Sequence, residues 1–388
     1  MTNVRRAVVL TGALTFAVAA GLTGSPAQAM KELQPATSQV TLSVLPEQAY
    51  EPVIEFIRSA RKTLDYNIYQ FNDDTIADEL KAAHRRGVDV RVMFTWQTFA
   101  ASSDIWDDSS PHYNKNMPTY KELKRAGIGV RLSPYQYTYS HEKTMIADSG
   151  TAQGRALIMD FNAQPSYLVP TVQFGVQQVG SRGFAVTTSN QQDVREIQAV
   201  FDADWQRRPP PKFTSPRLIW SPSGAGYNPR GQGKERIFAL MDGAKKTLDV
   251  YALLIDYPPF QRRLIAAAQR GVEVRVITNT SPAPMSYGQL KEIAAAGVKF
   301  SFDPMYPGGL LFVHSKAIVR DVGTSNQMAF VGSQNPGDYV SLTSERELGI
   351  LLGKPSIIEE MHTIFNQDWE HSKPLTYANG EPVNPFID

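Results

Sequence analysis

The segment Arg86–Val92, RGVDVRV, recurs later in the chain as Arg270–Val276, RGVEVRV. In both copies valines alternate with charged residues, which predicts a β-strand that is buried on one face. A second phrase is repeated in the same way, as ARKTLD at residues 60–65 and AKKTLD at residues 244–249. Self-similarity of this kind is the signature of a repeated supersecondary unit. We therefore expect a chain made of two similar halves.

The pattern within the first half predicts alternating helices and strands. Apolar residues have helical spacing over Val53–Ala60 and Thr75–Arg86, and strand-like segments follow at Leu64–Phe71 and Val88–Phe94. Gly87, directly after the second helical segment, is typical of a helix C-terminus. This alternation predicts an α/β fold with a largely parallel sheet in each half. Two such halves are expected to form lobes related by a pseudo-twofold axis.

The N-terminal residues have the layout of a secretory signal. Arg5 and Arg6 form a basic start, an apolar run extends from Ala7 to about Leu22, and the tripeptide Ala-Gln-Ala ends at Ala29. This layout predicts cleavage after Ala29 and a secreted mature chain. The alternative is an uncleaved membrane anchor, although the apolar run is short for a membrane span.

Four segments are predicted from these features: a signal peptide at 1–29, an N-terminal lobe at 30–208, a Pro-rich basic linker at 209–219 and a C-terminal lobe at 220–388. The first half also carries extra residues at about 100–116. These are either a surface insertion or a loop over the mouth of the active site, because loops that leave the strand ends of α/β sheets often line the site.

The charge balance bears on the class of substrate. The chain has 39 Lys and Arg against 38 Asp and Glu, and the predicted signal peptide contains two of the arginines. A nearly neutral mature chain disfavours non-specific binding to nucleic acid, which needs a basic excess. The chain contains no cysteine, so it has neither a disulfide framework nor thiol chemistry.

The candidate chemistry lies in a pattern His-x-Lys-x-x-x-x-Asp that occurs once in each half. Along a strand, His and Lys at this spacing share one face. An imidazole can attack phosphorus or transfer a proton, and an ammonium group neutralises the phosphate oxygens as charge builds up. The Asp is expected to close the strand or to act on the imidazole. The two sets are His141, Lys143 and Asp148 in the first half and His314, Lys316 and Asp321 in the second.

These motifs resemble the signature of the phospholipase D superfamily, in which H-x-K-x4-D is followed by G-S-x-N. The second half continues with Gly332–Asn335, GSQN, and Glu347 matches an acidic position that orients the histidine in that family. The resemblance extends from about residue 40 to 370. It implies lobes of the phospholipase D type with one active site at their interface, and no metal or other cofactor. It also implies that Asn162, Ser333 and Asn335 bind the substrate together with Glu347.

The first half departs from the family pattern at two positions. Met159–Asn162 reads MDFN, so that Asp160 stands where the serine is expected, and Gly183 stands at the position that corresponds to Glu347. A carboxylate near an anionic substrate is unfavourable unless it is protonated, paired or turned away. The two departures indicate either an unusual substrate or reduced activity.

The resemblance implies a two-step reaction through a phosphohistidine. One histidine attacks phosphorus, and the other protonates the leaving oxygen and then activates water or an alcohol. By the family pattern His141 is the nucleophile and His314 the acid. If Glu347 supports His314, however, the reverse assignment is favoured, because a histidine with a carboxylate partner is the better oriented nucleophile. Both assignments stay open.

Three functions are compatible with these features. The first is a secreted phospholipase D that hydrolyses phospholipid headgroups or transfers the phosphatidyl group to alcohols. It would meet its substrate transiently at a membrane or micelle surface and would be complete as a monomer. The second is an extracellular nuclease of the same superfamily, which the charge balance disfavours. The third is a degenerate phosphate-binding or interaction protein, for which two complete His/Lys/Asp sets would be unnecessary.

Overall fold

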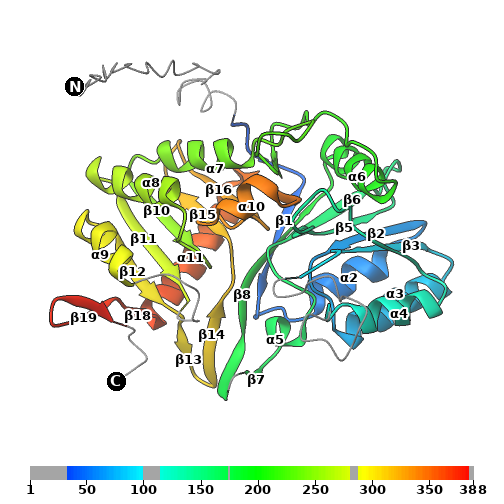
Figure 1. The fold of residues 1–388 in the computed structure, drawn as a ribbon, viewed down its shortest axis with the longest axis horizontal. Coiled ribbons are helices and arrows are strands. Elements are labelled where there is room, and N and C mark those ends of the chain that lie inside the picture. The colour runs from blue at the N-terminus through cyan, green and yellow to red at the C-terminus, as the bar shows by residue number, and fades with distance from the viewer. Residues whose placement is uncertain (1–32, 99–113, 174, 280–286, 384–388) are drawn as a thin grey trace, which may run out of the picture.

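The computed structural model describes residues 33–98, 114–173, 175–279 and 287–383. It confirms a mixed α/β fold with two lobes, each built on one large sheet that is flanked by helices (Figure 1). The predicted signal peptide, and the extra residues of the first half up to residue 113, lie outside the described residues. None of the helices in the described part of the chain is long and apolar enough to cross a membrane.

The first sheet has ten strands in the order β13-β14-β8-β6-β5-β2-β3-β4, and β1 and β7 also pair with β8. Two of its strands, β13 and β14, come from the second half of the sequence. The strands are β1 (Val40–Leu45), β2 (Thr63–Ile68), β3 (Asp89–Phe94), β4 (Gly129–Leu132), β5 (Lys143–Ala147), β6 (Arg155–Met159), β7 (Thr171–Gln173), β8 (Val176–Thr188), β13 (Met305–Tyr306) and β14 (Gly309–Val313).

The second sheet has eight strands in the order β18-β12-β11-β10-β15-β16-β17-β9. A short separate hairpin, β19–β20, follows it. The strands are β9 (Leu218–Ser221), β10 (Thr247–Tyr251), β11 (Glu273–Thr278), β12 (Lys299–Phe302), β15 (Ala317–Arg320), β16 (Met328–Gly332), β17 (Glu347–Leu352), β18 (Lys373–Pro374), β19 (Thr376–Ala378) and β20 (Glu381–Val383).

The expectation of largely parallel sheets is wrong. In the first lobe β2, β3 and β4 are parallel, whereas β5 and β6 join antiparallel to β2 and to each other. The second lobe repeats this arrangement with β10, β11, β12, β15 and β16. The physical reason is the connection: β5 and β6 are joined by a short turn, and such a turn can link only antiparallel neighbours. Hydrophobic alternation carries no information on strand direction.

Helices cover both sheets. Each predicted helix of the first half is present and buries an apolar stripe; α2, for example, buries Val53, Phe56 and Ile57 against the sheet. Figure 1 shows α2, α3 and α4 beside the first sheet and α7, α8 and α9 beside the second. The helices are α2 (Glu51–Ser59), α3 (Asp74–Arg85), α4 (Met117–Arg125), α5 (Pro165–Leu168), α6 (Gln191–Trp205), α7 (Gly233–Asp242), α8 (Pro258–Gln269), α9 (Tyr287–Ala295), α10 (Tyr339–Ser344) and α11 (Pro355–His371).

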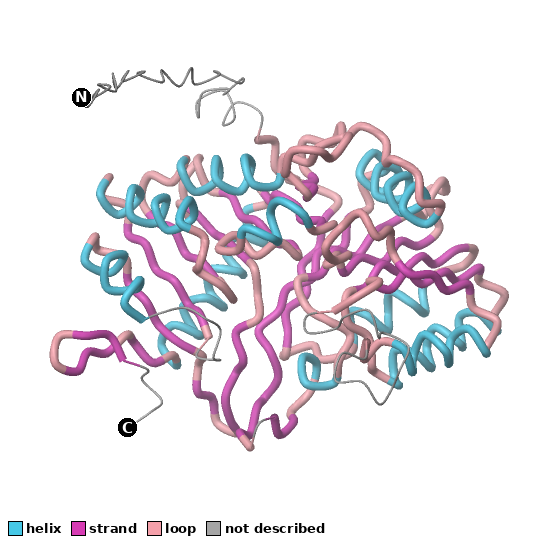
Figure 2. The backbone as a smooth tube through the Cα atoms, in the orientation of Figure 1, coloured by secondary structure: helices cyan, strands magenta, loops and turns pink. Residues whose placement is uncertain are grey.

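The two lobes share a hydrophobic core. Phe184 and Val186 of β8 belong to the same buried cluster as Leu348 and Ile350 of β17, and α6 and α11 also contribute to it. Figure 2 shows the strands of both lobes meeting in the middle of the molecule, where β14 runs parallel to β8. The lobes are therefore joined by continuous packing and by backbone pairing.

Two buried ion pairs cross between the lobes in opposite directions. Arg346, just before β17, binds Asp204 of α6, with Nε and Oδ2 2.8 Å apart. Arg182 of β8 binds Asp368 of α11, with Nε and Oδ2 2.7 Å apart. All four side chains are buried. The equivalence of the two pairs is direct evidence for the pseudo-twofold relation.

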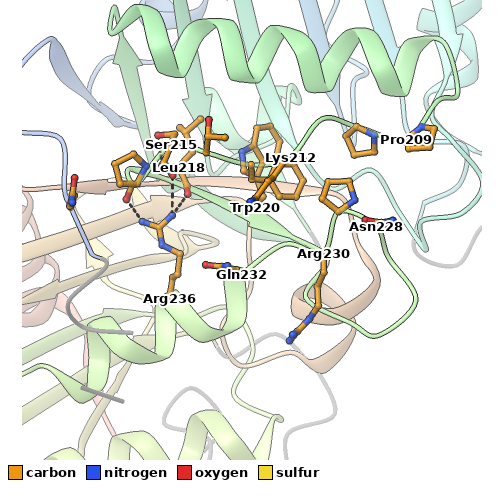
Figure 3. A pocket seen from close by; sticks show the side chains of 15 residues that line it. Pro209, Lys212, Ser215, Leu218, Trp220, Asn228, Arg230, Gln232 and Arg236 are labelled. Atoms are coloured by element: carbon orange, nitrogen blue, oxygen red, sulfur yellow. Dashed lines mark hydrogen bonds between the residues drawn. The ribbon is translucent and has the colours of Figure 1, made fainter. Parts of the chain in front are cut away.

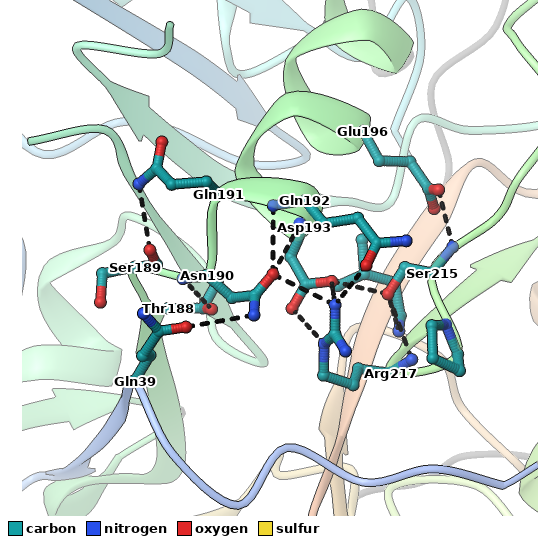
Figure 4. Close-up of polar contacts among 12 residues, drawn as sticks. Gln39, Thr188, Ser189, Asn190, Gln191, Gln192, Asp193, Glu196, Ser215 and Arg217 are labelled. Carbon is teal, nitrogen blue, oxygen red and sulfur yellow. Dashed lines mark hydrogen bonds and ion pairs between the residues drawn. The ribbon is translucent and has the colours of Figure 1, made fainter. Parts of the chain in front are cut away.

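The chain between the lobes is held by polar contacts to the start of α6 (Figure 4). Arg217 donates to both carboxylate oxygens of Asp193, at 2.8 and 2.9 Å. Ser215 Oγ donates to Asp193 at 2.6 Å, and Glu196 accepts from the backbone N–H of Ser215 at 2.8 Å. Asn190 caps the same helix by accepting from Gln192 and Asp193. These contacts fix the end of the Pro-rich segment to the first lobe.

Candidate active site

The two motif histidines lie directly before central strands of the two sheets. His141 precedes β5, and His314 precedes β15. Each is anchored by a strand of the other lobe: the N–H of His141 donates to the carbonyl of Arg346 at 2.9 Å, and Val313 pairs with Arg182. Lys316 Nζ lies 3.4 Å from the backbone carbonyl of Asp160 in the first lobe, and, besides burial, the charges of Lys316 and His314 lower the pKa of His141, so the two motifs converge on one site.

His141 is paired with Glu347. Its Nδ1 lies 2.6 Å from Oε1 of Glu347 and 3.6 Å from a carboxylate oxygen of Glu345. The other oxygen of Glu347 accepts from Ser341 Oγ at 2.8 Å. The prediction that Glu347 supports His314 is therefore wrong, and its contact with the substrate stays a prediction. The reason is that the backbone of Arg346, next to Glu347, is hydrogen-bonded to the segment around His141 in the other lobe.

His314 has a different partner. Lys316 Nζ lies 2.8 Å from Nδ1 of His314 and 3.1 Å from Nε2. The edge of the Tyr167 ring from α5 packs against the imidazole, with centroids 4.7 Å apart. Gly183 on β8 occupies the place that Glu347 has on β17, so β8 supplies no carboxylate to this ring.

The centre of the site brings two histidines and two lysines together in a buried position. Both motif lysines are fully buried. Burial lowers the pKa of Lys143 to about 7, and burial together with the charge of Lys143 lowers the pKa of Lys316 well below its ordinary value. Burial and the lysines also lower the pKa of both histidines. An anionic phosphodiester placed among these groups would offset the positive charge and raise all four pKa values.

Asp148 and Asp321, predicted as catalytic, lie at the far ends of the strands. Asp148 accepts from the backbone N–H groups of Arg61–Thr63, and Asp321 accepts from those of Lys245–Thr247, at 2.6 to 3.1 Å. Both residues have positive φ, of 52° and 53°. The expectation that the Asp closes the strand is confirmed, whereas a direct role on the imidazole is excluded by the engagement of both carboxylates elsewhere.

The two asparagines have matching environments. The Nδ2 group of Asn162 donates to Gln70 Oε1 at 3.1 Å. The backbone N–H of Asn335 donates to Ser341 Oγ at 2.8 Å. Among the described residues, Oδ1 of each asparagine is buried without a partner. Oδ1 is an acceptor, so a phosphate oxygen could be bound only by the Nδ2 group of each amide. Ser333 differs, because its Oγ is bound to the backbone of Leu348 at 3.2 and 3.3 Å.

Asp160 is the site residue whose role the sequence did not reveal. Its carboxylate is buried and reaches across the interface to the second motif, where Ser315 Oγ donates to Oδ2 at 2.5 Å. Glu345 and Tyr167 were also missed. Glu345 could have been noticed as a second acidic residue two positions from Glu347. Tyr167 belongs to a short helix with no pattern of its own.

A group of three buried side chains could hold a metal ion: the ligand atoms of His141, Glu345 and Glu347 lie within 4.8 Å of one another. Burial raises the pKa of Glu345 to about 8, and burial and Glu345 raise the pKa of Glu347 well above its ordinary range. A divalent cation would have to displace protons from these carboxyl groups. A hydrogen-bonded acid pair beside His141 accounts for the same geometry.

A cavity of about 810 Å³ lies away from the histidines, between the inter-lobe segment and the second lobe (Figure 3). Its walls include Lys212, Trp220 and Arg230. Arg236, also in the wall, donates to the backbone carbonyls of Pro216 and Leu218 and so holds the segment in place. This cavity is therefore separate from the histidine and lysine motifs.

Comparison with known proteins agrees with this geometry. The family model described as "Cardiolipin synthase, PLD-like domain" matches residues 53–205 and 237–369. None of the curated proteins matches the chain. The fold is similar to that of phosphatidylserine synthase from Haemophilus influenzae, with a TM-score of 0.67, 13% identity, and coverage of 91% of this chain and 92% of that one.

A second similar structure is polyphosphate kinase from Porphyromonas gingivalis, with a TM-score of 0.61 and 17% identity. The match covers 89% of this chain and 53% of the kinase, so this chain spans about half the length of that protein. At these identities the two structures support the fold alone. The family match covers the repeated elements of both halves and includes both histidine motifs, and on this evidence the chain belongs to the phospholipase D superfamily.

Proposed function

We propose that the chain is a secreted phospholipase D that cleaves the headgroup phosphodiester of phospholipids, by hydrolysis or by transfer to an alcohol. The observation that carries the proposal is the convergence of two His/Lys pairs from different lobes, with His141 bound to Glu347 at 2.6 Å. A degenerate binding protein has no need of an oriented imidazole. Members of the superfamily act on phosphodiesters, and we propose that the phosphodiester cleaved here is that of a phospholipid.

The pairing of His141 with Glu347 favours His141 as the nucleophile. If Nδ1–H donates to Glu347, Nε2 carries the lone pair and can attack phosphorus. The bond from phosphorus to the headgroup oxygen breaks, and His314 gives that oxygen a proton. In the second step His314 takes a proton from water or an alcohol, whose oxygen attacks phosphorus and releases His141. Lys143, Lys316 and the Nδ2 groups of Asn162 and Asn335 stabilise the phosphate oxygens.

Apolar side chains near the site support a lipid substrate. Val172 of β7, Val176 of β8 and Met305 of β13 are exposed at 65%, 46% and 42%. β7 pairs with β8, and β14 lies between β8 and β13 in the same sheet. β7 and β8 both pack against α5, whose Tyr167 contacts His314. The near-neutral charge gives no support to a nuclease.

Export and a monomeric enzyme are part of the proposal. Backbone pairing of the N-terminal segment with the second sheet begins at Ala36, which bonds to Leu351, so cleavage after Ala29 would leave every described contact intact. Both motifs lie on one chain, so that one copy can complete the site. Sequencing the N-terminus of protein recovered from the culture medium tests export, with Met30 as the expected first residue.

The function is tested with residues 30–388 and the variant His314→Ala in the presence of EDTA. We expect headgroup release from mixed phospholipid micelles by the unchanged chain and its loss in the variant. Single-stranded DNA serves as the parallel substrate. Cleavage of DNA alone would favour the nuclease over the phospholipase. If folded protein cleaves neither substrate, both functions are rejected.

A further inference from the structure

The two departures of the first half, Asp160 and Gly183, lie next to each other in space. Asp160 follows β6 and Gly183 is on the paired strand β8, where the N–H of Asp160 donates to the carbonyl of Phe184 at 3.1 Å. A Cβ added to Gly183 would lie 3.2 Å from Oδ1 of Asp160. The carboxylate of Asp160 therefore occupies the space into which a side chain at position 183 would point.

One oxygen of Asp160 does the work of the serine that it replaces. In the second half Ser333 Oγ accepts from the backbone N–H of Leu348 at 3.2 Å. In the first half Oδ1 of Asp160 accepts from the backbone N–H of Phe184 at 2.8 Å, which is the equivalent contact. The strand pairing is the same in both halves, so the replacement keeps the local structure and leaves the second carboxylate oxygen available.

The second oxygen reaches the other lobe. Oδ2 of Asp160 accepts from Ser315 Oγ at 2.5 Å and from the backbone N–H of Lys316 at 3.3 Å. Lys316 Nζ also donates to the backbone carbonyl of Asp160 at 3.4 Å. These contacts hold the segment between His314 and Lys316. They mirror Glu347, whose carboxylate crosses the interface in the opposite direction to His141.

We propose that Asp160 is the positioning residue of the His314–Lys316 half of the site and replaces the carboxylate that β8 lacks at Gly183. The proposal rests on the proposed function, in which His314 protonates the leaving oxygen. The two departures compensate each other: a carboxylate has moved from one strand to its neighbour, and it now holds the motif backbone instead of the imidazole. The first half is therefore altered without being inactivated.

The test compares substrates that differ in their need for an acid. The choline of phosphatidylcholine would leave as an alkoxide and therefore needs a proton. The leaving group of phosphatidyl-p-nitrophenol is a stable phenolate, which needs none. We expect Asp160→Ser to lower kcat on phosphatidylcholine by about 10²-fold, as for loss of general acid catalysis, with KM little changed. In the burst phase with the nitrophenyl ester, which reports the first step alone and needs no acid, we expect the rate to fall by less than about threefold. Equal losses on both substrates would overturn the proposal.

The rescue variant combines Asp160→Ser with Gly183→Glu, which returns the carboxylate to β8. We expect it to recover at least about tenfold in kcat on phosphatidylcholine. Gly183 does not have a positive φ, so its backbone accepts a side chain, but a Cβ there would also meet Phe161 Cδ1 at 2.8 Å. Unfolding temperatures are therefore measured for every variant. Asp204→Asn is the control, since it removes a buried carboxylate of the interface and should affect both substrates alike.

A measurement without turnover separates this proposal from the proposed function. In ¹⁵N-histidine NMR spectra, Asp160→Asn should shift the ring signals of His314 and leave those of His141 unchanged. Unchanged His314 signals in a folded variant would refute the positioning role even if the enzyme is active. If the unchanged chain cleaves neither substrate, the proposed function fails, and the NMR spectra still decide whether Asp160 positions His314.

Discussion

The two halves of the site occupy equivalent places but surround their histidines differently. His141 faces the carboxylate of Glu347, whereas His314 faces the ammonium group of Lys316. A carboxylate favours the imidazolium that forms on nucleophilic attack, and an ammonium group disfavours a resting positive charge on the ring. Under the proposed mechanism the repeated backbone is kept, and the exchanges at positions 160 and 183 give the two histidines separate roles.

Removal of either histidine should have the largest effect on the reaction rate, and the two variants should fail at different steps. With phosphatidyl-p-nitrophenol, His141→Ala should lower the rate by at least about 10³-fold, because the nucleophile is lost. His314→Ala should instead release about one nitrophenol per enzyme in a burst and then stall, because the second step lacks its base. Stopped-flow absorbance measures both. A burst in His141→Ala and none in His314→Ala would reverse the assignment.

Glu347→Gln should produce the next largest effect. Gln cannot fix the tautomer or stabilise the imidazolium, and we expect kcat to fall by about 10²–10⁴-fold, as for triad carboxylates. Glu345→Gln is the matched control, because Glu345 lies 3.6 Å from the same ring nitrogen and should matter less. Steady-state kinetics on phosphatidylcholine measures both variants. Equal losses would mean that the acid pair acts as one unit.

The crossed ion pairs allow the same comparison for stability. Asp368→Asn and Asp204→Asn each remove the buried carboxylate partner of an arginine, although Arg182 keeps a second ion pair with Glu47 at 2.6 Å, and we expect losses of about 3–5 kcal/mol in the free energy of unfolding. The loss should be greater for Asp368, because Tyr251 and Tyr306 also donate to it, at 2.5 and 2.7 Å. Denaturant titration measures the difference. A larger loss for Asp204→Asn would contradict this order.

The residue between His and Lys differs in the two motifs, with Glu142 in the first and Ser315 in the second. Burial raises the pKa of Glu142 from 4.5 to about 7. A carboxyl group with a raised pKa in the folded state contributes stability below pH 4.5, and this contribution is lost as the pH rises through about 7. Relative to Glu142→Gln, the unchanged chain should therefore lose up to about 3 kcal/mol between pH 4.5 and 8.

Thermal unfolding of both proteins across this pH range checks the result. Gln keeps an acceptor for Asn67 Nδ2, which now donates to Glu142 at 3.0 Å, so that the comparison isolates the ionisation. The stability difference should be smallest at the acid end. A difference that does not change with pH would show that Glu142 keeps the same charge throughout.

The smallest effect on activity is expected for Asp148 and Asp321, which make the same backbone contacts in both halves. Asp148→Asn and Asp321→Asn remove one of two carboxylate oxygens that hold three backbone N–H groups, and each should cost about 1–2 kcal/mol of unfolding free energy. Because neither residue touches an imidazole, kcat should stay within a few-fold of the unchanged enzyme. Calorimetry and kinetics on the same samples separate the two effects. A large fall in kcat with normal stability would restore a catalytic role.

Much of the architecture could be predicted from local patterns. The repeated RGV phrases, the helical spacing around Val53 and the His-x-Lys spacing of each motif act over a few residues, where backbone periodicity and side-chain type determine the element. The superfamily, the two lobes and the closing role of the aspartates followed from them. Strand direction did not follow, because alternation is the same in parallel and antiparallel strands.

The sequence by itself determined which side chains are candidates for the chemistry: two imidazoles, two lysines and two asparagines at equivalent positions of a repeated unit. Only the tertiary structure decided how they are paired. Glu347 serves His141 because the His141 segment is bonded to the neighbouring Arg346 of the other lobe, and Asp160 reaches Ser315 across the same interface. Contacts between residues more than 150 positions apart depend on how two lobes pack, and no local pattern encodes that packing.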